Sequence, residues 1–295
     1  MVYQSVIAGL VTALCWGTAD FTSRGQSDRI GYYKTIIYSM VITLVVLIPL
    51  TPVVSPHLVA PAFPMLVLVV AGLLNFVAFT FLYRAFHKGV VSVVAPVAYT
   101  YPAITTVLSI ALLGTLLSSV QIFAIAGIIV GVILTSTKLS ALRQSFSGGR
   151  APNLTAGFLP ALGAAVFFGG VYVGVGYAAP LVSVVVPVMV LRIMGISVGA
   201  VLAPLFKQDI RPSKSIFSKP LIFMGILEAI GFLALTYGIS IPGGSLPVVT
   251  AISGMGGAVA AGFGLVLLKE RLEMNQVLGV VISLLGVFVL LYLGG

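Results

Sequence analysis

The sequence predicts an all-α integral membrane protein, with ten transmembrane helices arranged as two inverted five-helix repeats. Composition leads to the first part of this prediction. Of the 295 residues, 60% are hydrophobic and 7% are charged, whereas a soluble globular domain carries about 25% charged residues. With a mean hydropathy of +1.22, the chain could not cover its surface with polar groups in water. We therefore expect lipid to be its solvent.

Ten apolar segments are each close to the length of about 20 residues that a helix needs to cross about 30 Å of hydrocarbon. Helices are expected because an open strand edge would leave backbone groups unpaired in lipid. The segments cover about residues 4–23, 32–51, 65–86, 90–112, 120–137, 155–177, 183–205, 220–240, 246–268 and 275–293.

The last hairpin of each half indicates an internal duplication, which a repeated pattern at a fixed interval reveals. A shift of 155 residues places 112–134 on 267–289. Weaker echoes pair Trp16 with Phe168, Lys34 with Arg192 and Asn75 with Glu228. We therefore predict a first repeat at 1–137, a cytoplasmic linker at 138–154 and a second repeat at 155–295. In the hairpins, the matched positions are Leu112, Leu113, Leu117, Gln121, Gly131 and Val132 with Leu267, Leu268, Leu272, Gln276, Gly286 and Val287.

Basic residues alternate along the chain with the apolar segments. Fourteen of the fifteen lie in odd-numbered connections, and the other, Arg192, lies inside the seventh segment. Since Lys and Arg are enriched in cytoplasmic loops, we expect a multi-pass protein of the plasma membrane with both termini outside. Five helices per half would invert the second half, a recurring design of secondary transporters. The net charge of +9 in short loops favours anionic lipid over nucleic acid as a partner.

Three stretches carry a resemblance to a known family: 16–21, 225–232 and 269–272. They resemble, in that order, a tryptophan-glycine motif in the first helix, an eighth-helix pattern and an acidic signature that closes each repeat. These are features of the drug/metabolite transporter superfamily, in particular its EamA-type ten-helix members. Thr115 stands where the first repeat's signature glutamate is common. The resemblance implies an exporter or exchanger of small metabolites with a central cavity between the halves.

Glu228 and Arg192 are the ionisable residues that lie deepest in apolar segments. Such a group costs about 2.5–3.5 kcal/mol at a helix centre, so each needs a reason to be there. They could form a structural ion pair between neighbouring helices. Alternatively, they could face a central cavity, with Glu228 as a proton carrier or cation site and Arg192 as the anchor of a substrate carboxylate or phosphate.

Other candidate substrate-binding or coupling residues are polar or aromatic. Asn75 is the expected counterpart of Glu228, and Asp20 lies four residues before Arg24, where an i,i+4 pair also explains it. Aromatic side chains on the first, fourth, sixth and eighth segments could line a cavity, although aromatics also face lipid in many membrane proteins. Among Trp16, Tyr99, Tyr101, Phe168, Tyr172 and Tyr237, we favour Trp16, Tyr99 and Tyr172.

The favoured function is secondary transport of a small amphipathic metabolite, such as an amino acid, by alternating access. Proton coupling stays open, as does export of lipid-linked or drug-like cations. A passive channel and an intramembrane enzyme are alternatives of other classes, but the sequence holds only scattered single residues for catalysis. A phosphate-binding loop is missing, so we do not expect ATP to drive transport. We expect no cofactor, and no metal because the chain has one cysteine and two histidines. A monomer is expected.

Overall fold

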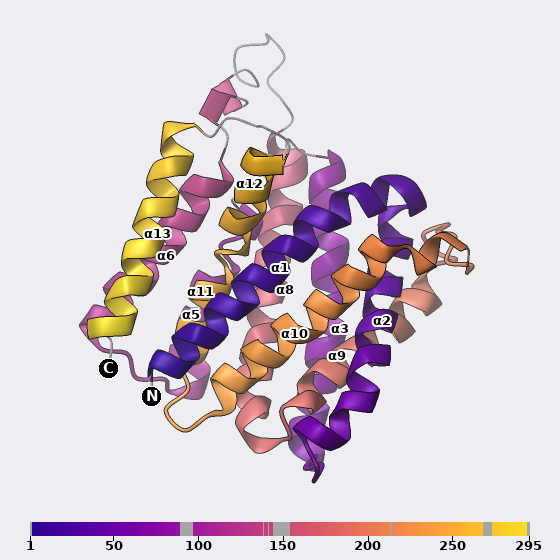
Figure 1. The fold of residues 1–295 in the computed structure, drawn as a ribbon, viewed down its shortest axis with the longest axis horizontal. Helices are drawn as coiled ribbons and strands as arrows, with labels where there is room; N and C mark the ends of the chain where they lie inside the picture. The colour runs from indigo at the N-terminus through magenta and orange to yellow at the C-terminus, as the bar shows by residue number, and fades with distance from the viewer. Residues whose placement is uncertain are drawn as a thin grey trace.

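The computed structural model describes residues 2–88, 97–137, 139–140, 142–143, 154–212, 214–267 and 273–293. Every regular element within these ranges is a helix (Figure 1). The bounds are α1 Val2–Ile30, α2 Tyr32–Val54, α3 Ala62–Lys88, α5 Tyr101–Leu113, α6 Ser119–Ser136, α8 Leu154–Ala178, η1 Ala179–Leu181, α9 Val185–Leu202, η2 Lys214–Phe217, α10 Lys219–Ser240, α11 Leu246–Ser253, α12 Gly256–Leu267 and α13 Met274–Leu293.

Within the described residues, eight helices are long and apolar enough to cross a membrane. The fourth and ninth predicted segments carry shorter apolar helices instead. The ninth segment was expected to be continuous, but a turn at Gly254 and Met255 divides it into α11 and α12. Glycine is a poor helix former, and three of the four residues from 254 to 257 are glycine. A similar turn at Tyr99 and Thr100 precedes α5 in the fourth segment.

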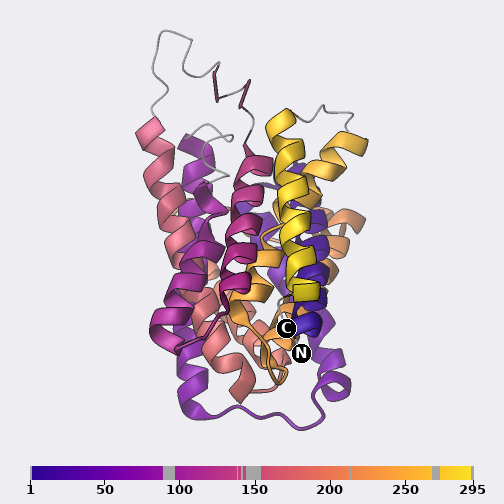
Figure 2. The same cartoon turned by 90° about the vertical axis from the view of Figure 1, so that its left-hand side faces the viewer.

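Both termini lie at the same end of the bundle, whereas α6 ends and α8 begins at the opposite end (Figures 1 and 2). We refer to these as the terminal end and the linker end. Helix α1 therefore starts at the terminal end, and α8, the first helix of the second half, starts at the linker end. The basic motif at 269–272 and most of the linker lie outside the described residues.

The main helix contacts occur in equivalent sets. Helix α1 packs on α10 as α3 packs on α8, and α1 packs on α12 as α5 packs on α8. Helix α2 contacts α10 as α3 contacts α9, while α6 packs on α13 and α2 on α9. Two copies of one helical unit related by a two-fold axis would produce this pattern.

The α6–α13 pair repeats its own contacts at the interval of 155 residues. A Cβ atom added to Gly131 would lie 2.5 Å from the carbonyl oxygen of Gly279, and one added to Gly286 would lie 2.9 Å from that of Ala124. These two contacts are the same contact in the two halves, since both partners shift by 155 residues. Both leave room only for glycine at the crossing point.

The helix N-termini of this pair are capped in the same way. The Gln121 side-chain oxygen accepts from the Ser118 backbone N–H at 3.0 Å, and the Gln276 side-chain oxygen accepts from the Glu273 backbone N–H at 3.0 Å. Each bond satisfies a backbone donor that the first turn of a helix leaves free. Gln121 and Gln276, which match in sequence, therefore cap their helices in the same way.

Gly131→Ala is expected to destabilise the protein by about 1–3 kcal/mol, the usual cost of overpacking a close contact. The methyl group would meet backbone atoms of α13, which cannot rotate away. Gly127→Ala is the matched control on the same helix, because its Cβ would meet nothing within 4 Å. Thermal unfolding of the two variants in detergent compares them, and equal melting temperatures would contradict the proposed α6–α13 packing.

Candidate functional site

The two deepest ionisable residues form an ion pair. Arg192 on α9 donates from Nη2 to Oε2 of Glu228 on α10. The Arg192 side chain is 2% exposed and that of Glu228 is 19% exposed, so the guanidinium is enclosed while the carboxylate keeps an opening. A charge this deeply buried is tolerated only beside its partner.

Phe232 covers the face of the guanidinium. The Arg192 Cζ atom lies 4.4 Å from the centre of the Phe232 ring, within the range of a cation–π contact. Phe232 follows Glu228 by four residues, so both side chains lie on one face of α10. One turn of α10 thus supplies both the carboxylate and the aromatic ring that hold Arg192.

Aromatic rings from both halves continue from this pair. Ring centroids lie 4.8 Å apart between Trp16 and Phe232, 6.1 Å between Trp16 and Tyr172, and 5.1 Å between Tyr172 and Tyr101. These separations suit tilted aromatic pairs. We call the following six residues the central cluster: Trp16 on α1, Tyr101 on α5, Tyr172 on α8, Arg192 on α9, and Glu228 and Phe232 on α10.

Two N–H donors in the central cluster have no hydrogen-bond partner among the residues that the structure describes. They are Nε of Arg192 and Nε1 of Trp16, and both atoms are buried. Nε1 of Trp16 points at α10, where a Cβ on Gly231 would lie only 2.7 Å away. A buried donor without a partner costs about 1–3 kcal/mol. Since buried donors are nearly always paired, these two need a partner other than the described protein atoms, such as water or a bound molecule.

The remaining sequence candidates occupy three different places. Asp20 is exposed on α1, and its charge acts on Tyr101 and Tyr172; the side chain of Arg24, its expected partner, lies outside the described residues. Tyr99 packs at the turn before α5, where its Cζ would lie 3.3 Å from a Cβ on Gly257. Asn75 is 3% exposed on α3.

Equivalent glycine contacts define which residues correspond between the halves. A Cβ on Gly72 of α3 would lie 2.6 Å from the Met194 Cβ on α9, and one on Gly225 of α10 would lie 2.6 Å from the Ile42 Cβ on α2. These are the same contact seen in each half. Residues of α9 therefore follow their α2 counterparts by 152 positions, and residues of α10 follow those of α3 by 153.

This correspondence pairs Asn75 with Glu228, as the sequence predicts. It also pairs Met40 with Arg192, so the expected match of Lys34 with Arg192 was wrong. The central cluster is consequently asymmetric. The second half carries a charged pair where the first half carries a methionine and an asparagine.

Polar contacts between the halves cross the linker end. Lys34 of α2 lies 3.0 Å from the Asp209 carboxylate, and the Tyr38 hydroxyl donates to the Ile210 carbonyl at 3.0 Å. The Arg211 backbone N–H, and secondly Lys34, hold the pKa of Asp209 below its ordinary value. A lowered carboxylate pKa means that this contact persists at neutral pH and is lost only as the pH falls through the lowered value.

The terminal end is held by the connections that follow α2 and α8. The Ser183 N–H donates to the Val59 carbonyl at 3.0 Å, and the Val59 N–H donates to the Ser183 hydroxyl at 2.8 Å. The same hydroxyl donates to the His57 carbonyl at 3.0 Å. Each end of the bundle therefore has its own set of hydrogen bonds between the halves.

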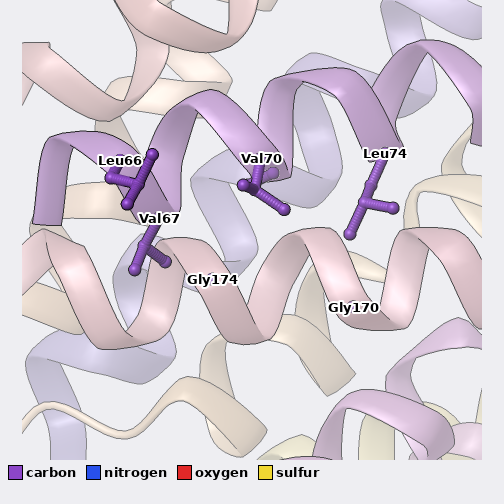
Figure 3. Close-up of a pocket in the computed structure, with 7 residues that line it drawn as sticks. Leu66, Val67, Val70, Leu74, Gly170 and Gly174 are labelled. Carbon is purple, nitrogen blue, oxygen red and sulfur yellow. The ribbon is translucent and has the colours of Figure 1, made fainter. Parts of the chain in front are cut away.

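A hollow of about 240 Å³ lies between α3 and α8 (Figure 3). Leu66 and Val70 at its mouth are 58% and 47% exposed, so it opens on the outer surface of the bundle. Tyr172 lies two residues from Gly170 and two from Gly174 on α8. Its side chain therefore projects from the side of α8 opposite to the hollow. The hollow is separate from the central cluster. Its lining is Leu66, Val67, Val70, Ala71, Leu74, Gly170 and Gly174.

Comparison with known proteins identifies the family. The sequence pattern of the EamA-like transporter family matches residues 4–137 and again residues 155–292. The chain belongs to the EamA-like transporter family. It is therefore a multi-pass membrane transporter, and the two matches divide this EamA-like chain into the two repeats seen in its helix contacts.

One protein sequence and one solved structure are also similar to this EamA-like chain. An uncharacterized protein of Methanocaldococcus jannaschii is 31% identical over 137 residues, which cover 45% of this chain and 96% of that protein. The matched stretch is thus less than half of this chain and nearly the whole of that relative. A solved crystal structure of a protein superposes with a TM-score of 0.78 at 17% identity, covering 98% of each chain. That likeness shows the shared fold.

The sequence did not single out Phe232 or Cys15, and it favoured Tyr99 over Tyr101. Phe232 could have been found, because it follows Glu228 by one helical turn. Cys15, which is buried and acts electrostatically with Glu228, precedes Trp16 and gave no signal of its own. The choice between Tyr99 and Tyr101 depends on where α5 begins in this EamA-like chain, and a turn at residue 99 is not readable from an apolar run.

Proposed function

We propose that the chain is a secondary transporter that carries a small amphipathic metabolite, such as an amino acid or a related compound, by alternating access. The observation that carries this proposal is the central cluster. It combines a buried ion pair, aromatic surface and donors without partners at the point where α1 and α5 of one half meet α8, α9 and α10 of the other.

The proposed architecture is ten transmembrane segments in two inverted repeats. Support comes from the equivalent helix contacts and from the opposite starting ends of α1 and α8. The half-length relative supports the view that one repeat is an evolutionary unit. In inverted-repeat transporters, the substrate site lies between the repeats near the bilayer midplane, which is where a deep ion pair would be found.

The turns in the fourth and ninth segments also support transport. Discontinuous helices form substrate sites in several transporter folds, because unwound backbone is tolerated where it lines a cavity. Tyr101 begins α5 directly after its turn and reaches Tyr172. The breaks thus lie beside the central cluster rather than in the lipid-facing surface.

The ion pair distinguishes the proposal from its alternatives. A cation bound to Glu228 would leave the Arg192 guanidinium buried without a partner, which costs about 3–5 kcal/mol. A channel would need polar positions along a continuous path, whereas the central cluster is mainly aromatic. An enzyme would need a set of catalytic groups, and the two charged residues of the cluster, Glu228 and Arg192, are already paired with each other.

We further propose that the linker end faces the cytoplasm of a cell whose plasma membrane holds the protein, since the basic connections gather at that end. A single chain holds both halves, so a monomer is expected to be sufficient. In this arrangement, the Val59–Ser183 contacts would close the outside and the Lys34–Asp209 contacts the inside.

Cross-linking at each end tests both the mechanism and the orientation. In a Cys15→Ala background, Val59→Cys/Ser183→Cys and Lys34→Cys/Asp209→Cys each place a cysteine pair across one end. A bifunctional maleimide that cannot cross membranes should link only the first pair when it is added outside intact cells. After purification and reconstitution in liposomes, either cross-link should reduce counterflow by at least about tenfold, because alternating access needs both ends to open in turn.

Compounds for the counterflow assay come from a screen for ligands that raise the melting temperature. The four single-cysteine variants, treated with the same reagent, are the controls. Saturable counterflow that survives both cross-links would contradict alternating access. Conductance without saturation would indicate a channel, and chemical conversion of the compound would indicate an enzyme.

A further inference from the structure

We propose that Glu228 is an internal competitor for the substrate: an organic carboxylate displaces the Glu228 carboxylate from Arg192, and the released Glu228 takes up one proton. This inference rests on the proposed transport function and names its substrate class, a carboxylate with an apolar body. It also names the step at which protons enter the cycle.

The donors of Arg192 point to displacement rather than simple addition. A guanidinium binds a carboxylate best through two parallel N–H bonds. On Arg192, one such edge consists of Nε and Nη2, which point the same way. Glu228 holds Nη2, whereas Nε has no partner among the described residues. Glu228 therefore uses half of an edge that a two-oxygen ligand would fill completely.

Burial decides which member of the pair can leave. Arg192 is 2% exposed and is held in place by Phe232 at 4.4 Å, while Glu228 is 19% exposed. The carboxylate therefore has an opening through which a ligand can arrive, and the guanidinium does not. Trp16 lies 4.8 Å from Phe232, so an apolar substrate body at the pair would contact these two rings.

Charge balance then requires a proton. Before binding, the positive Arg192 and the negative Glu228 cancel. Once a ligand carboxylate holds Arg192, Glu228 has no opposite charge to face among the described groups around it. Those groups are Cys15 of α1 and Tyr172 of α8, both acids, and Asp20 lies further along α1. A buried carboxylate without a counter-ion is neutralised by protonation.

The step conserves atoms and charge. One ligand carboxylate and one proton from water enter, the Arg192–Glu228 bond breaks, a ligand–Arg192 bond forms, and Glu228 becomes the neutral acid. Reversal of the step expels the ligand, because ionised Glu228 takes Arg192 back. The bound and empty sites have the same net charge, so each can reorient across the membrane without moving a charge against the potential.

The first half of the chain supplies the matched variant. Its counterparts of Arg192 and Glu228 are Met40 and Asn75, so Arg192→Met/Glu228→Asn installs a neutral pair that the fold already accommodates once. Lys34→Met/Asp209→Asn removes an ion pair at the linker end and controls for the loss of charge in general. Trp16 is the single tryptophan of the chain, so its fluorescence reports on the central cluster directly.

The experiment measures binding of 3-phenylpropionate and of its neutral amide, 3-phenylpropanamide, to the purified full-length protein by Trp16 fluorescence. Proton uptake is followed with a pH indicator in weakly buffered solution. We expect the carboxylate to bind at least about tenfold more tightly than the amide, with about one proton taken up per ligand. In the pH range where Glu228 is ionised in the empty protein, each increase of one pH unit should raise the dissociation constant of the carboxylate about tenfold.

The variant with the neutral pair should lose the preference for the carboxylate, and the linker-end control should keep it. Equal binding of carboxylate and amide to the native protein, or carboxylate binding without proton uptake, overturns the inference. If another class of compound shows saturable counterflow while carboxylates do not bind, the inference fails and the proposed transport function stands. Counterflow by no compound that binds would instead overturn the proposed function.

Discussion

Glu228→Gln is expected to lower the free energy of unfolding by about 3 kcal/mol, because it leaves the Arg192 charge buried without its counter-ion. Arg192 is 2% exposed and cannot reach water without moving α9. Glutamine keeps an oxygen that accepts from Nη2, so the cost falls at the low end of the range for a broken buried pair. Denaturant unfolding in mixed micelles measures the change.

The double variant Arg192→Met/Glu228→Asn is the comparison for this prediction. Removing both charges removes the desolvation cost together with the attraction, so its stability should lie within about 1 kcal/mol of the native protein. If Glu228→Gln is as stable as the native chain, the guanidinium is not dependent on its carboxylate. In that case, the Arg192–Glu228 ion pair would not be needed for the fold, and its proposed role in the site would lose its support.

Gly17→Ala should destabilise the protein by about 3 kcal/mol, at the upper end of the cost of overpacking. A Cβ at Gly17 would lie 2.4 Å from the carbonyl oxygen of Gly256 and 2.6 Å from the Val259 Cβ. The carbonyl belongs to the backbone at the start of α12, so α1 and α12 would have to separate. Trp16, the neighbour of Gly17, would shift with α1, and ligand binding at the central cluster should weaken as well.

Substitutions at two other glycines serve as comparisons for the stability loss expected from Gly17→Ala. Gly25→Ala lies on the same helix and would meet nothing within 4 Å, so its melting temperature should stay near the native value. Gly169→Ala, at the equivalent place in the second half, would lie 2.5 Å from Cγ2 of the Ile104 side chain. The Thr105 backbone nitrogen would lie 3.5 Å from the Cβ added at Gly169, so the loss there should be smaller than at Gly17, whose Cβ would meet a backbone carbonyl oxygen at 2.4 Å. Thermal unfolding that ranks Gly25→Ala as the most damaging of the three would refute this packing.

The helices could be predicted because lipid offers no hydrogen bonds to the backbone. An apolar segment that crosses the membrane must therefore pair its own backbone N–H and C=O groups, as a helix does. The repeat could be predicted because glycine at a close crossing cannot be replaced, which preserved Gly131 and Gly286 in register. Helix breaks were not predictable in the same way. The less apolar residues at the turns near Tyr99 and Gly254 are few and are flanked by long apolar stretches, so each segment is still interpreted as one continuous span.

The candidate site likewise contains residues that the sequence could predict and residues that it could not. Glu228 and Arg192 stood out because a charge in lipid is costly, and the structure brings them into contact. Aromatic residues carry no comparable cost, so Tyr101 was indistinguishable from rings that face lipid, and only the spacing of one helical turn from Glu228 marked Phe232. Lys34 was matched to Arg192 through a small change of register, which differs from the register of the glycine contacts. The two halves keep their packing in common and not their charges, which is why Met40 is the true counterpart.

Counterflow by the variant Arg192→Met/Glu228→Asn tests the central claim most directly, since its expected stability separates function from folding. The assay uses liposomes and a compound that the native protein exchanges, with the melting temperature measured on the same preparation. The central cluster as a substrate site predicts a folded protein whose counterflow falls at least about tenfold. A folded variant that exchanges the compound at the native rate would contradict it and leave the ion pair a structural feature.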